Sequence, residues 1–306
     1  MRWYMDLLIR NIAKVGRADI TADSITVIAG YNGSGKTAVS KALYAMLLCS
    51  SSEASDKARI ESSFSTLYGS QLITHGSAEG SRITLRNSSG EFSLAFSRDG
   101  LSLQSYYPIG RDMSTLYLRA PSRWSSLSPD ALDSALLRPL LSERTPLITA
   151  ADELLGKFSS GSIEERNGSL YYADDDYPGF LVDLPNASSG AVIMAVFRRL
   201  IENGTIHEGS MLIIDEPETN LHPEKQVMLA RLFASLSSDY GIRFLISSHN
   251  IYFIRALEVA LSEHSEERHR FYLMSQDDGS PLYHSEDATE SMEKIYHELY
   301  SPLEDL

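Results

Sequence analysis

One stretch of the sequence has residue types and a spacing that suit phosphate binding. Residues 30–37 read G-Y-N-G-S-G-K-T and match the pattern G-x-x-x-x-G-K-T. Glycines let the backbone curl so that its N–H groups point at phosphate oxygens, and the N-terminus of a following helix adds its positive dipole end. Lys36 can reach the outer phosphates, and the Thr37 hydroxyl can bind Mg²⁺. A glycine-rich turn without a ligand would also fit the pattern alone.

The segments on both sides of this loop would hold it in place. Residues 24–29 form an apolar run typical of a buried strand, and residues 37–49 carry apolar side chains at helical spacing. A strand, a glycine loop and a helix in this order are the context that phosphate binding requires. We therefore expect the phosphates to contact Asn32, Gly33, Ser34, Gly35, Lys36, Thr37 and Ala38.

An acidic pair follows a second predicted strand. Asp215 and Glu216 come directly after the apolar run 211–214. Nucleotides bind at the carboxyl ends of parallel strands in open α/β folds. Asp215 would hold Mg²⁺ through coordinated waters, and Glu216 would orient and polarise the attacking water as a general base. Taken alone, the pair could equally be an acidic surface turn.

His249 comes just after a third predicted strand, 242–246. If that strand is parallel to 211–214, the imidazole lies at the same sheet edge, within reach of a γ-phosphate or an attacking water. A lone histidine at a strand end is more often structural, but this position favours a role at the site. Small residues at 187–190, before a predicted helix at 191–202, offer either a second anion-binding surface or only a helix cap.

The composition restricts the class of protein. The chain has 306 residues, 43% of them hydrophobic, which is enough for one large domain or two modest ones. Its net charge of −14 argues against tight stand-alone binding to nucleic acid. The single cysteine, Cys49, excludes an internal disulfide and is expected to be buried. No apolar run approaches about 18 residues and no signal peptide is recognisable, so we expect a cytoplasmic protein.

The hydrophobic periodicity predicts strands and helices that alternate in the flanks of the chain, which implies a mostly parallel α/β core. Asp287 and Glu290 resemble the capping box of a final helix that would reach about Leu299. Strands are expected at 3–9, 24–29, 81–86, 91–97, 101–107, 114–118, 211–214, 242–246 and 271–274. Helices are expected at 37–49, 129–142, 147–158, 191–202, 223–237 and 250–262.

Together, and in this order, these motifs resemble an ABC-type ATPase of the AAA_21 / OLD-like family, which is related to the RecF and SMC heads. The string D-E-P-E-T-N-L-H-P at 215–223 is the most characteristic. The resemblance covers nearly the whole chain and implies one α/β domain with the fold of a P-loop NTPase, an ABC-ATPase-like head. Its parts would be a β-rich phosphate-loop region (1–120), an inserted helical lobe with the signature segment (121–203), and a Walker B and switch-histidine region (204–306).

The resemblance also implies roles for single residues. Lys36, Glu216 and the switch histidine His249 would be catalytic, Thr37 and Asp215 would bind Mg²⁺, and residues 218–223 would be the D-loop. The signature segment would be Ala187, Ser188, Ser189 and Gly190, with Ser188 meeting the γ-phosphate of ATP held by a second copy. The implied cofactors are ATP and Mg²⁺, and the implied assembly is a head-to-tail homodimer.

Some positions depart from the family pattern or stay open. Ala191 stands where many relatives carry a polar residue. Gln71 and Gln104 are both candidates for the Q-loop glutamine. Arg119 or Arg123 would lie near the nucleotide or, equally, in a surface salt bridge.

We expect a stand-alone head without the TOPRIM nuclease domain that OLD-like proteins often carry. Such heads commonly work with a separate effector, a nuclease or a toxin, in phage defence. The leading hypothesis is an ATP-hydrolysing switch that dimerises around ATP and controls such an effector, with slow turnover in its absence. Alternatives are an ATP-locked scaffold that sequesters the effector and a RecF-like DNA repair ATPase, which the net charge disfavours. A transporter subunit fits the D-E-P-E-x-x-L-H-P string less well.

Overall fold

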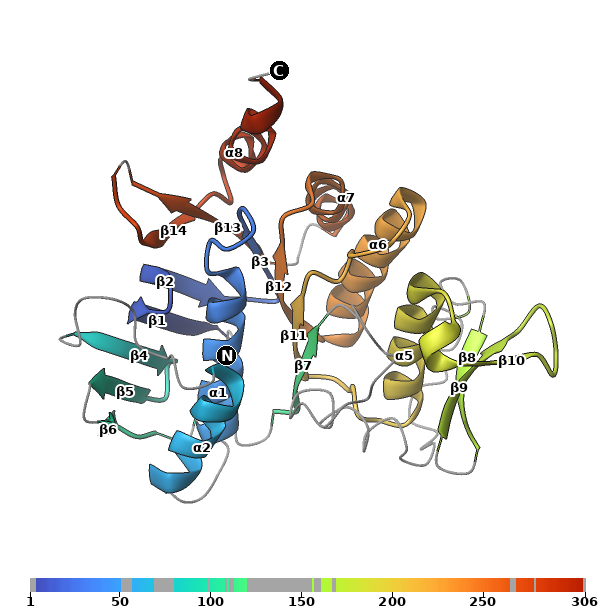
Figure 1. The fold of residues 1–306 in the computed structure, drawn as a ribbon, viewed down its shortest axis with the longest axis horizontal. Coiled ribbons are helices and arrows are strands. Elements are labelled where there is room, and N and C mark those ends of the chain that lie inside the picture. Colours follow the sequence, from blue (N-terminus) through green and yellow to red (C-terminus); the bar gives the residue numbers. More distant parts are fainter. Residues whose placement is uncertain are drawn as a thin grey trace.

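An 11-stranded mixed sheet with helices on both faces forms the centre of the described structure (Figure 1). The structure is a computed structural model that describes residues 4–50, 57–68, 80–97, 100–107, 109, 113–119, 156, 161–166, 169–264, 268–277 and 279–304. The large sheet contains β1 (Met5–Ile12), β2 (Val15–Ala22), β3 (Ile25–Ala29), β4 (Ser81–Arg86), β5 (Glu91–Ser97), β6 (Gly100–Ser105), β7 (Thr115–Arg119), β11 (Met211–Asp215), β12 (Arg243–Ser248), β13 (His269–Gln276) and β14 (Tyr283–Asp287).

One half of this sheet is parallel. Its strands lie in the order β13, β3, β12, β11 and β7, and each neighbouring pair is parallel. Asp215 at the end of β11 is opposite Ser247 on β12, and Ser248 is opposite Ala29 at the end of β3. The loops that follow β3, β11 and β12 therefore leave the sheet side by side, at its carboxyl edge.

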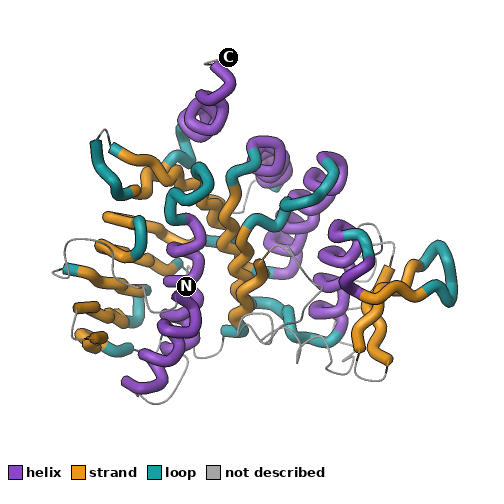
Figure 2. Tube along the Cα trace, in the orientation of Figure 1, coloured by secondary structure: helices purple, strands orange, loops and turns teal. Residues whose placement is uncertain are grey.

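The other half is mostly antiparallel. β14 pairs antiparallel with β13 and parallel with β2, and the order then continues through β1, β4, β5 and β6. Hairpins connect β1 to β2 and β4 to β5. This half carries the N-terminal part of the chain and lies at the left of Figure 2.

Side chains of the central strands alternate between two cores. Met211 and Ile213 face the core beneath α1 (Lys36–Ser50) and α2 (Lys57–Tyr68). Leu212 and Ile214 face the core beneath α5 (Ser189–Glu202), α6 (Pro223–Tyr240) and α7 (Ile251–Ser262). Full burial of an aliphatic side chain of this size contributes about 1.5–3 kcal/mol, so the apolar run of β11 stabilises both layers.

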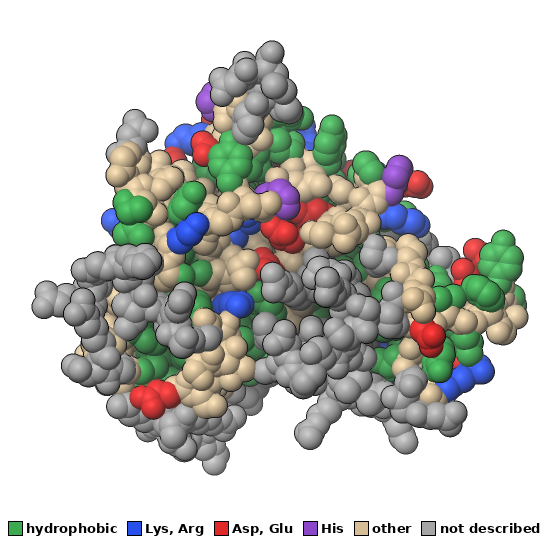
Figure 3. All heavy atoms as spheres, viewed as in Figure 1, with side chains coloured by type: hydrophobic (Ala, Val, Ile, Leu, Met, Phe, Trp, Pro, Cys, Tyr) green, Lys and Arg blue, Asp and Glu red, His purple; other side chains and the backbone are tan. Residues whose placement is uncertain are grey.

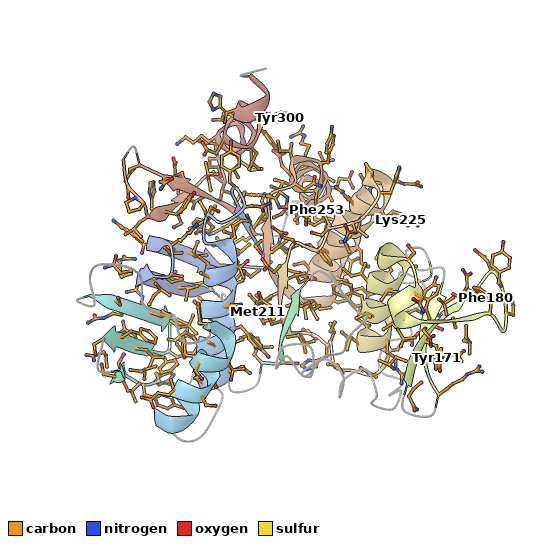
Figure 4. All side chains as sticks on the ribbon, viewed as in Figure 1. Tyr171, Phe180, Met211, Lys225, Phe253 and Tyr300 are labelled. Atoms are coloured by element: carbon orange, nitrogen blue, oxygen red, sulfur yellow. The ribbon has the colours of Figure 1, made fainter. Side chains whose placement is uncertain are left out.

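The helices beside the parallel strands have well-defined ends. α6 begins after His222, whose Nδ1 accepts the Glu224 N–H at 3.4 Å, and it ends at Gly241 with φ 62°. A left-handed conformation at this position suits glycine. α7 begins after Asn250, whose Oδ1 accepts the Phe253 N–H at 3.2 Å. Phe253 itself is buried in the core (Figure 4). These caps fix where the loops after β11 and β12 stop.

A second, smaller sheet projects beside α5. It is antiparallel and consists of β10 (Leu181–Asp183), β9 (Ser169–Asp174) and β8 (Gly161–Arg166). Arg198 on α5 donates to the Gly161 carbonyl and pairs with Asp175, which ties this sheet to the helix. Figure 4 shows Phe180 at its outer end.

The structure confirms most elements of the parallel half. The predicted strands at 24–29, 211–214, 242–246 and 271–274 correspond to β3, β11, β12 and β13, and the helices at 37–49, 191–202, 223–237 and 250–262 correspond to α1, α5, α6 and α7. The hairpin of 81–86 and 91–97 is present as β4 and β5. The expected helices at 129–142 and 147–158 lie outside the described residues. Cys49 is buried, as expected.

Several elements were not predicted: α2, β2, β14 and the three strands of the small sheet, which lie in the region expected to be a helical lobe. The capping-box interpretation was wrong. Asp287 belongs to β14 and accepts the Thr289 N–H at 3.0 Å, whereas the last helix, α8 (Met292–Glu304), begins later. The carboxylate therefore stabilises the turn before the helix. None of the helices in the described residues combines the length and apolar character needed to cross a membrane.

Candidate functional site

The glycine loop between β3 and α1 is tightly curled. Gly30, Gly33 and Gly35 have φ values of 150°, 82° and 95°, which favour glycine. A Cβ at Gly30 would lie 2.9 Å from the Met274 carbonyl oxygen, and one at Gly35 would lie 2.7 Å from a methyl of Val15. The first and last glycines of the pattern are therefore required both by backbone conformation and by space.

Lys36 lies inside the curl of this loop. It is 4% exposed, and its Nζ donates to the carbonyl oxygens of Gly30 at 2.7 Å and Tyr31 at 2.8 Å. Burial lowers the pKa of Lys36, and the nearby carboxylates of Glu216 and Asp215 partly oppose this shift. An anion in the loop would find the ammonium group and the N-terminus of α1 directed at the same place.

Asp215 joins the end of β11 to the start of α1. The Thr37 hydroxyl donates to Asp215 Oδ2 at 2.8 Å, and the Ser247 hydroxyl donates to the other carboxylate oxygen. A hydroxyl and a carboxylate in contact are hard oxygen ligands of the kind Mg²⁺ prefers when it also keeps waters and phosphate oxygens. Within the described ranges no group of three or more His, Cys, Asp and Glu side chains could hold a metal ion. The oxygens of Thr37 and Asp215 fit a Mg²⁺ ion that keeps waters and phosphate oxygens as its other ligands.

Glu216 adopts an unusual backbone conformation. Its φ is 53°, while its N–H still donates to the Ser247 carbonyl at 2.9 Å and continues the pairing of β11 with β12. The left-handed conformation turns the chain sharply at this point, and the carboxylate reaches His249, whose Nδ1 lies 3.0 Å from Glu216 Oε1. An ionised carboxylate only accepts hydrogen bonds, so Nδ1 is the donor.

The Glu216 contact raises the pKa of His249, since an adjacent carboxylate stabilises the imidazolium, although burial opposes the shift. Both side chains keep access to solvent, with exposed fractions of 39% for His249 and 31% for Glu216. Figure 3 shows acidic and histidine side chains next to each other near the middle of this face. The pair is thus open to a ligand, unlike the buried Asp215.

The segment expected to carry the signature lies at the start of α5. Ser188 is exposed and is the N-cap of the helix, but its side chain makes no capping hydrogen bond. A Cβ at Gly190 would lie 3.1 Å from Leu221, so glycine lets the helix approach the turn after β11. In Figure 1, α6 lies between α1 and α5. Since Ser188 is the N-cap of α5, the structure does not bring it to the phosphate loop of the same chain.

Other residues singled out in the sequence are placed as follows. The Cα of Arg119, the last residue of β7, is in register with that of Asp215, at the carboxyl edge of the sheet. Gln104 is exposed on the edge strand β6 and donates to Ser102 at 2.9 Å, which removes it as a glutamine of this site. Gln71 and Arg123 lie outside the described residues.

Three side chains near the site were assigned no role in the sequence analysis. Ser247 and Ser248 bind the carboxylates of Asp215 and Glu218, and the Tyr31 hydroxyl contacts α8. A signal for the serines existed, since two hydroxyl residues end an otherwise apolar strand directly before His249. No comparable signal marked Tyr31, because its partner is 267 residues away.

One protein-family model matches part of the chain. Residues 188–254 match the AAA ATPase domain family (AAA_15). This segment includes Ser188, the turn after β11 and the loop that carries His249. No curated protein matches the chain.

Three of the solved structures similar to this one are heads of SMC proteins. The SMC head bound to the C-terminal winged-helix domain of ScpA has a TM-score of 0.56 and 12% identity, with coverage of 95% of this chain and 99% of that chain. The Smc head with an extended coiled coil from Pyrococcus furiosus, bound to the C-terminal domain of ScpA, has a TM-score of 0.55, 14% identity and coverage of 98% and 100%. The SMC head of Thermotoga maritima has a TM-score of 0.49, 15% identity and coverage of 94% and 99%. The fold of this chain is that of an ABC-ATPase-like head.

Proposed function

We propose that this chain is an ATPase that acts as a switch: it closes as a dimer around ATP and opens on hydrolysis. The observation that carries the proposal is the convergence of five side chains at the carboxyl edge of the sheet. Lys36 and Thr37 come from the phosphate loop, Asp215 and Glu216 from the end of β11, and His249 from the end of β12. The match of 188–254 to an ATPase family supports the same chemistry.

Each of these residues has its own role in the transfer of the γ-phosphoryl group to water. The loop N–H groups and Lys36 bind the β- and γ-phosphates and balance their charge. Glu216 accepts a proton from the attacking water, and the His249 N–H orients that carboxylate. Thr37 and Asp215 would hold Mg²⁺, which when bound neutralises charge on the phosphate oxygens.

The second half of each site would come from another copy of the chain. Ser188 is exposed and makes no capping bond in its own helix, so its hydroxyl is available to the γ-phosphate of a partner. Gly190 packs close to Leu221, which would couple this segment to the turn that begins at Glu216. The D-E-P-E-T-N-L-H-P string and this arrangement support an OLD-like (AAA_21) head.

We further propose that the dimer controls a separate effector protein, a nuclease or a toxin, in anti-phage defence in the cytoplasm, with slow turnover until that partner engages. Two of the similar heads are described in complex with a domain of another protein, ScpA, which supports the idea that such heads act through partners. The net charge of −14 favours a protein partner over DNA.

Phosphate release from Mg-ATP tests the proposal. Lys36→Ala should abolish nucleotide binding and turnover, because the loop loses its only buried cation within the described residues of 30–37. Glu216→Gln should bind ATP normally but slow hydrolysis by at least about 100-fold, the usual range for a general base. Phosphate release by Glu216→Gln at the wild-type rate would rule out Glu216 as the base.

A further inference from the structure

A buried carboxylate beside the site has no part in the scheme above. Glu218 is 2% exposed, and its Oε1 accepts the Ser248 hydroxyl at 2.5 Å. Its other oxygen, Oε2, has no hydrogen-bond partner among the described residues. Burying a carboxyl group is costly unless its hydrogen bonds compensate for the lost water. A residue of this kind in the same turn as Glu216 needs a functional or structural reason.

The Ser248 hydroxyl has a defined orientation. Its oxygen accepts the Asn250 N–H at 3.1 Å, which leaves its proton directed at Glu218. Asn250 in turn caps α7 by accepting the Phe253 N–H. These bonds therefore hold Ser248 and Asn250, the two residues on either side of His249.

Besides the backbone bond from the Glu216 N–H to the Ser247 carbonyl, two side-chain contacts link the turn after β11 to the end of β12 and to the loop that follows it. The outer contact, between Glu216 and His249, is open to solvent. The inner contact, between Glu218 and Ser248, is buried. The inner one is shielded from water, so it is the better candidate to fix the spacing of the two segments.

The turn that carries Glu216 needs such an anchor. Glu216 and Asn220 have φ values of 53° and 63°, a region that costs non-glycine residues about 1–3 kcal/mol each. Backbone bonds from Thr219 N to Glu216 O, at 3.1 Å, and from Leu221 N to Glu218 O, at 3.0 Å, close the turn on itself. These two bonds do not attach the turn to β12; the Glu216 N–H does so where the turn begins, and the Glu218 side chain does so two residues later.

We propose that Glu218 is a positioning residue, whose buried bond to Ser248 sets the placement of Glu216 relative to His249. The inference rests on the proposed ATP hydrolysis. A displacement of about 1 Å at a catalytic group lowers the rate by on the order of 100-fold, so the loss of this bond should affect turnover more than ATP binding. Burial raises the pKa of Glu218 to about 7, so a neutral carboxamide is a close substitute for this side chain.

Steady-state kinetics of three variants test the proposal. Ser248→Ala removes the donor, Glu218→Ala removes the acceptor, and Glu218→Gln keeps an acceptor oxygen. We expect Ser248→Ala and Glu218→Ala to lower kcat at least about tenfold while KM for ATP stays within about threefold. Glu218→Gln should retain kcat within about threefold of the wild type. The double alanine variant should be no slower than the slower single variant, because both remove the same bond.

Ser50→Ala is the matched control. Ser50 is also fully buried, and its hydroxyl lies within hydrogen-bonding reach of the Ile109 carbonyl and of the Leu47 carbonyl, the latter at 3.1 Å. It lies at the far end of α1, about 20 Å along the helix from Lys36. The kcat of Ser50→Ala should equal that of the wild type. Because Ser248→Ala deletes a single oxygen atom, it keeps the test valid if Glu218→Ala fails to fold.

Two results would overturn the inference while leaving the ATPase proposal intact. One is a wild-type kcat in Ser248→Ala. The other is an equal loss of kcat in Glu218→Gln and Glu218→Ala. Since the glutamine keeps an acceptor for the Ser248 hydroxyl, that result would show that the bond does not determine kcat. Failure of the wild-type protein to release phosphate would instead overturn the proposed ATPase function itself.

Discussion

At the scale of single residues, each charged group of the site has a hydrogen-bonding partner that orients it. Asp215 accepts from Thr37 and Ser247, while the Lys36 ammonium is bound by carbonyl oxygens of its own loop. Glu216 is bound by His249. These partners orient the functional atoms before a ligand arrives, so little reorganisation is needed when phosphate binds.

The buried carboxyl of Glu218 predicts a pH dependence of stability. Its pKa is about 7 in the folded protein and 4.5 as the ordinary value, because burial disfavours the charged form. The folded state therefore binds this proton more tightly, and the resulting stability is complete below about pH 4.5 and is lost as the pH rises through about 7. Since a glutamine cannot ionise, Glu218→Gln should gain stability relative to the wild type over this interval, by up to about 3 kcal/mol.

Urea unfolding of both proteins at about pH 5 and about pH 8 measures this difference. The free energy of unfolding of the wild type should fall relative to that of Glu218→Gln between the two conditions. A difference that does not change with pH would mean that Glu218 is ionised in the folded protein throughout this interval.

At the scale of elements, the sequence predicted the parallel half of the sheet far better than the antiparallel half. The strands around Ile213 and Leu245 are short runs of buried apolar residues, and Gly30 and Gly241 mark where the chain turns. β14, in contrast, reads Y-H-S-E-D and is a strand only because it pairs with β13 and β2. Pairing between distant segments leaves no local pattern, so propensity alone could not find it.

The candidate site was likewise predicted only in part from the sequence. Residue types at strand ends were enough to select Lys36, Asp215, Glu216 and His249, because parallel strands share one carboxyl edge. The bond between Glu218 and Ser248 was not foreseen, since it depends on the left-handed turn at Glu216. Such a conformation is rare outside glycine and has no signature in the sequence.

The contact between the phosphate loop and α8 leads to a prediction for this helix. The Tyr31 hydroxyl donates to the Glu298 carbonyl, to which Ser301 Oγ also donates at 3.0 Å. In a helix this carbonyl would accept from residue 302, which is a proline and has no N–H. Tyr31→Phe should therefore weaken the end of α8 by about 1 kcal/mol, seen as faster amide exchange in residues 292–301.

Tyr300→Phe serves as the control for that experiment, because Tyr300 lies on the same helix with 41% of its surface exposed (Figure 4). Exchange in α6 should be unchanged in both variants. Equal exchange of α8 in Tyr31→Phe and in the wild type would show that the hydroxyl does not stabilise the helix.

At the scale of the whole molecule, the fold separates the two halves expected of an ATP site. The phosphate loop opens at the carboxyl edge of the sheet, and the start of α5 lies on the other side of α6 (Figure 1). A single copy thus presents Lys36 in one place and an exposed Ser188 in another. A head-to-tail pair would bring both together twice, as closed twofold symmetry requires.

The central claim is that ATP closes a dimer and that hydrolysis opens it. Light scattering of the protein after addition of Mg-ATP, with phosphate release followed in the same sample, tests it most directly. For the wild type we predict a rise to two copies that reverses as phosphate appears, and for Glu216→Gln a dimer that persists. Ser188→Arg should bind ATP but remain a single copy, because the bulky cation blocks the seam. A Glu216→Gln protein that stays a single copy at saturating ATP, or whose dimer is unaffected by Ser188→Arg, would contradict the account.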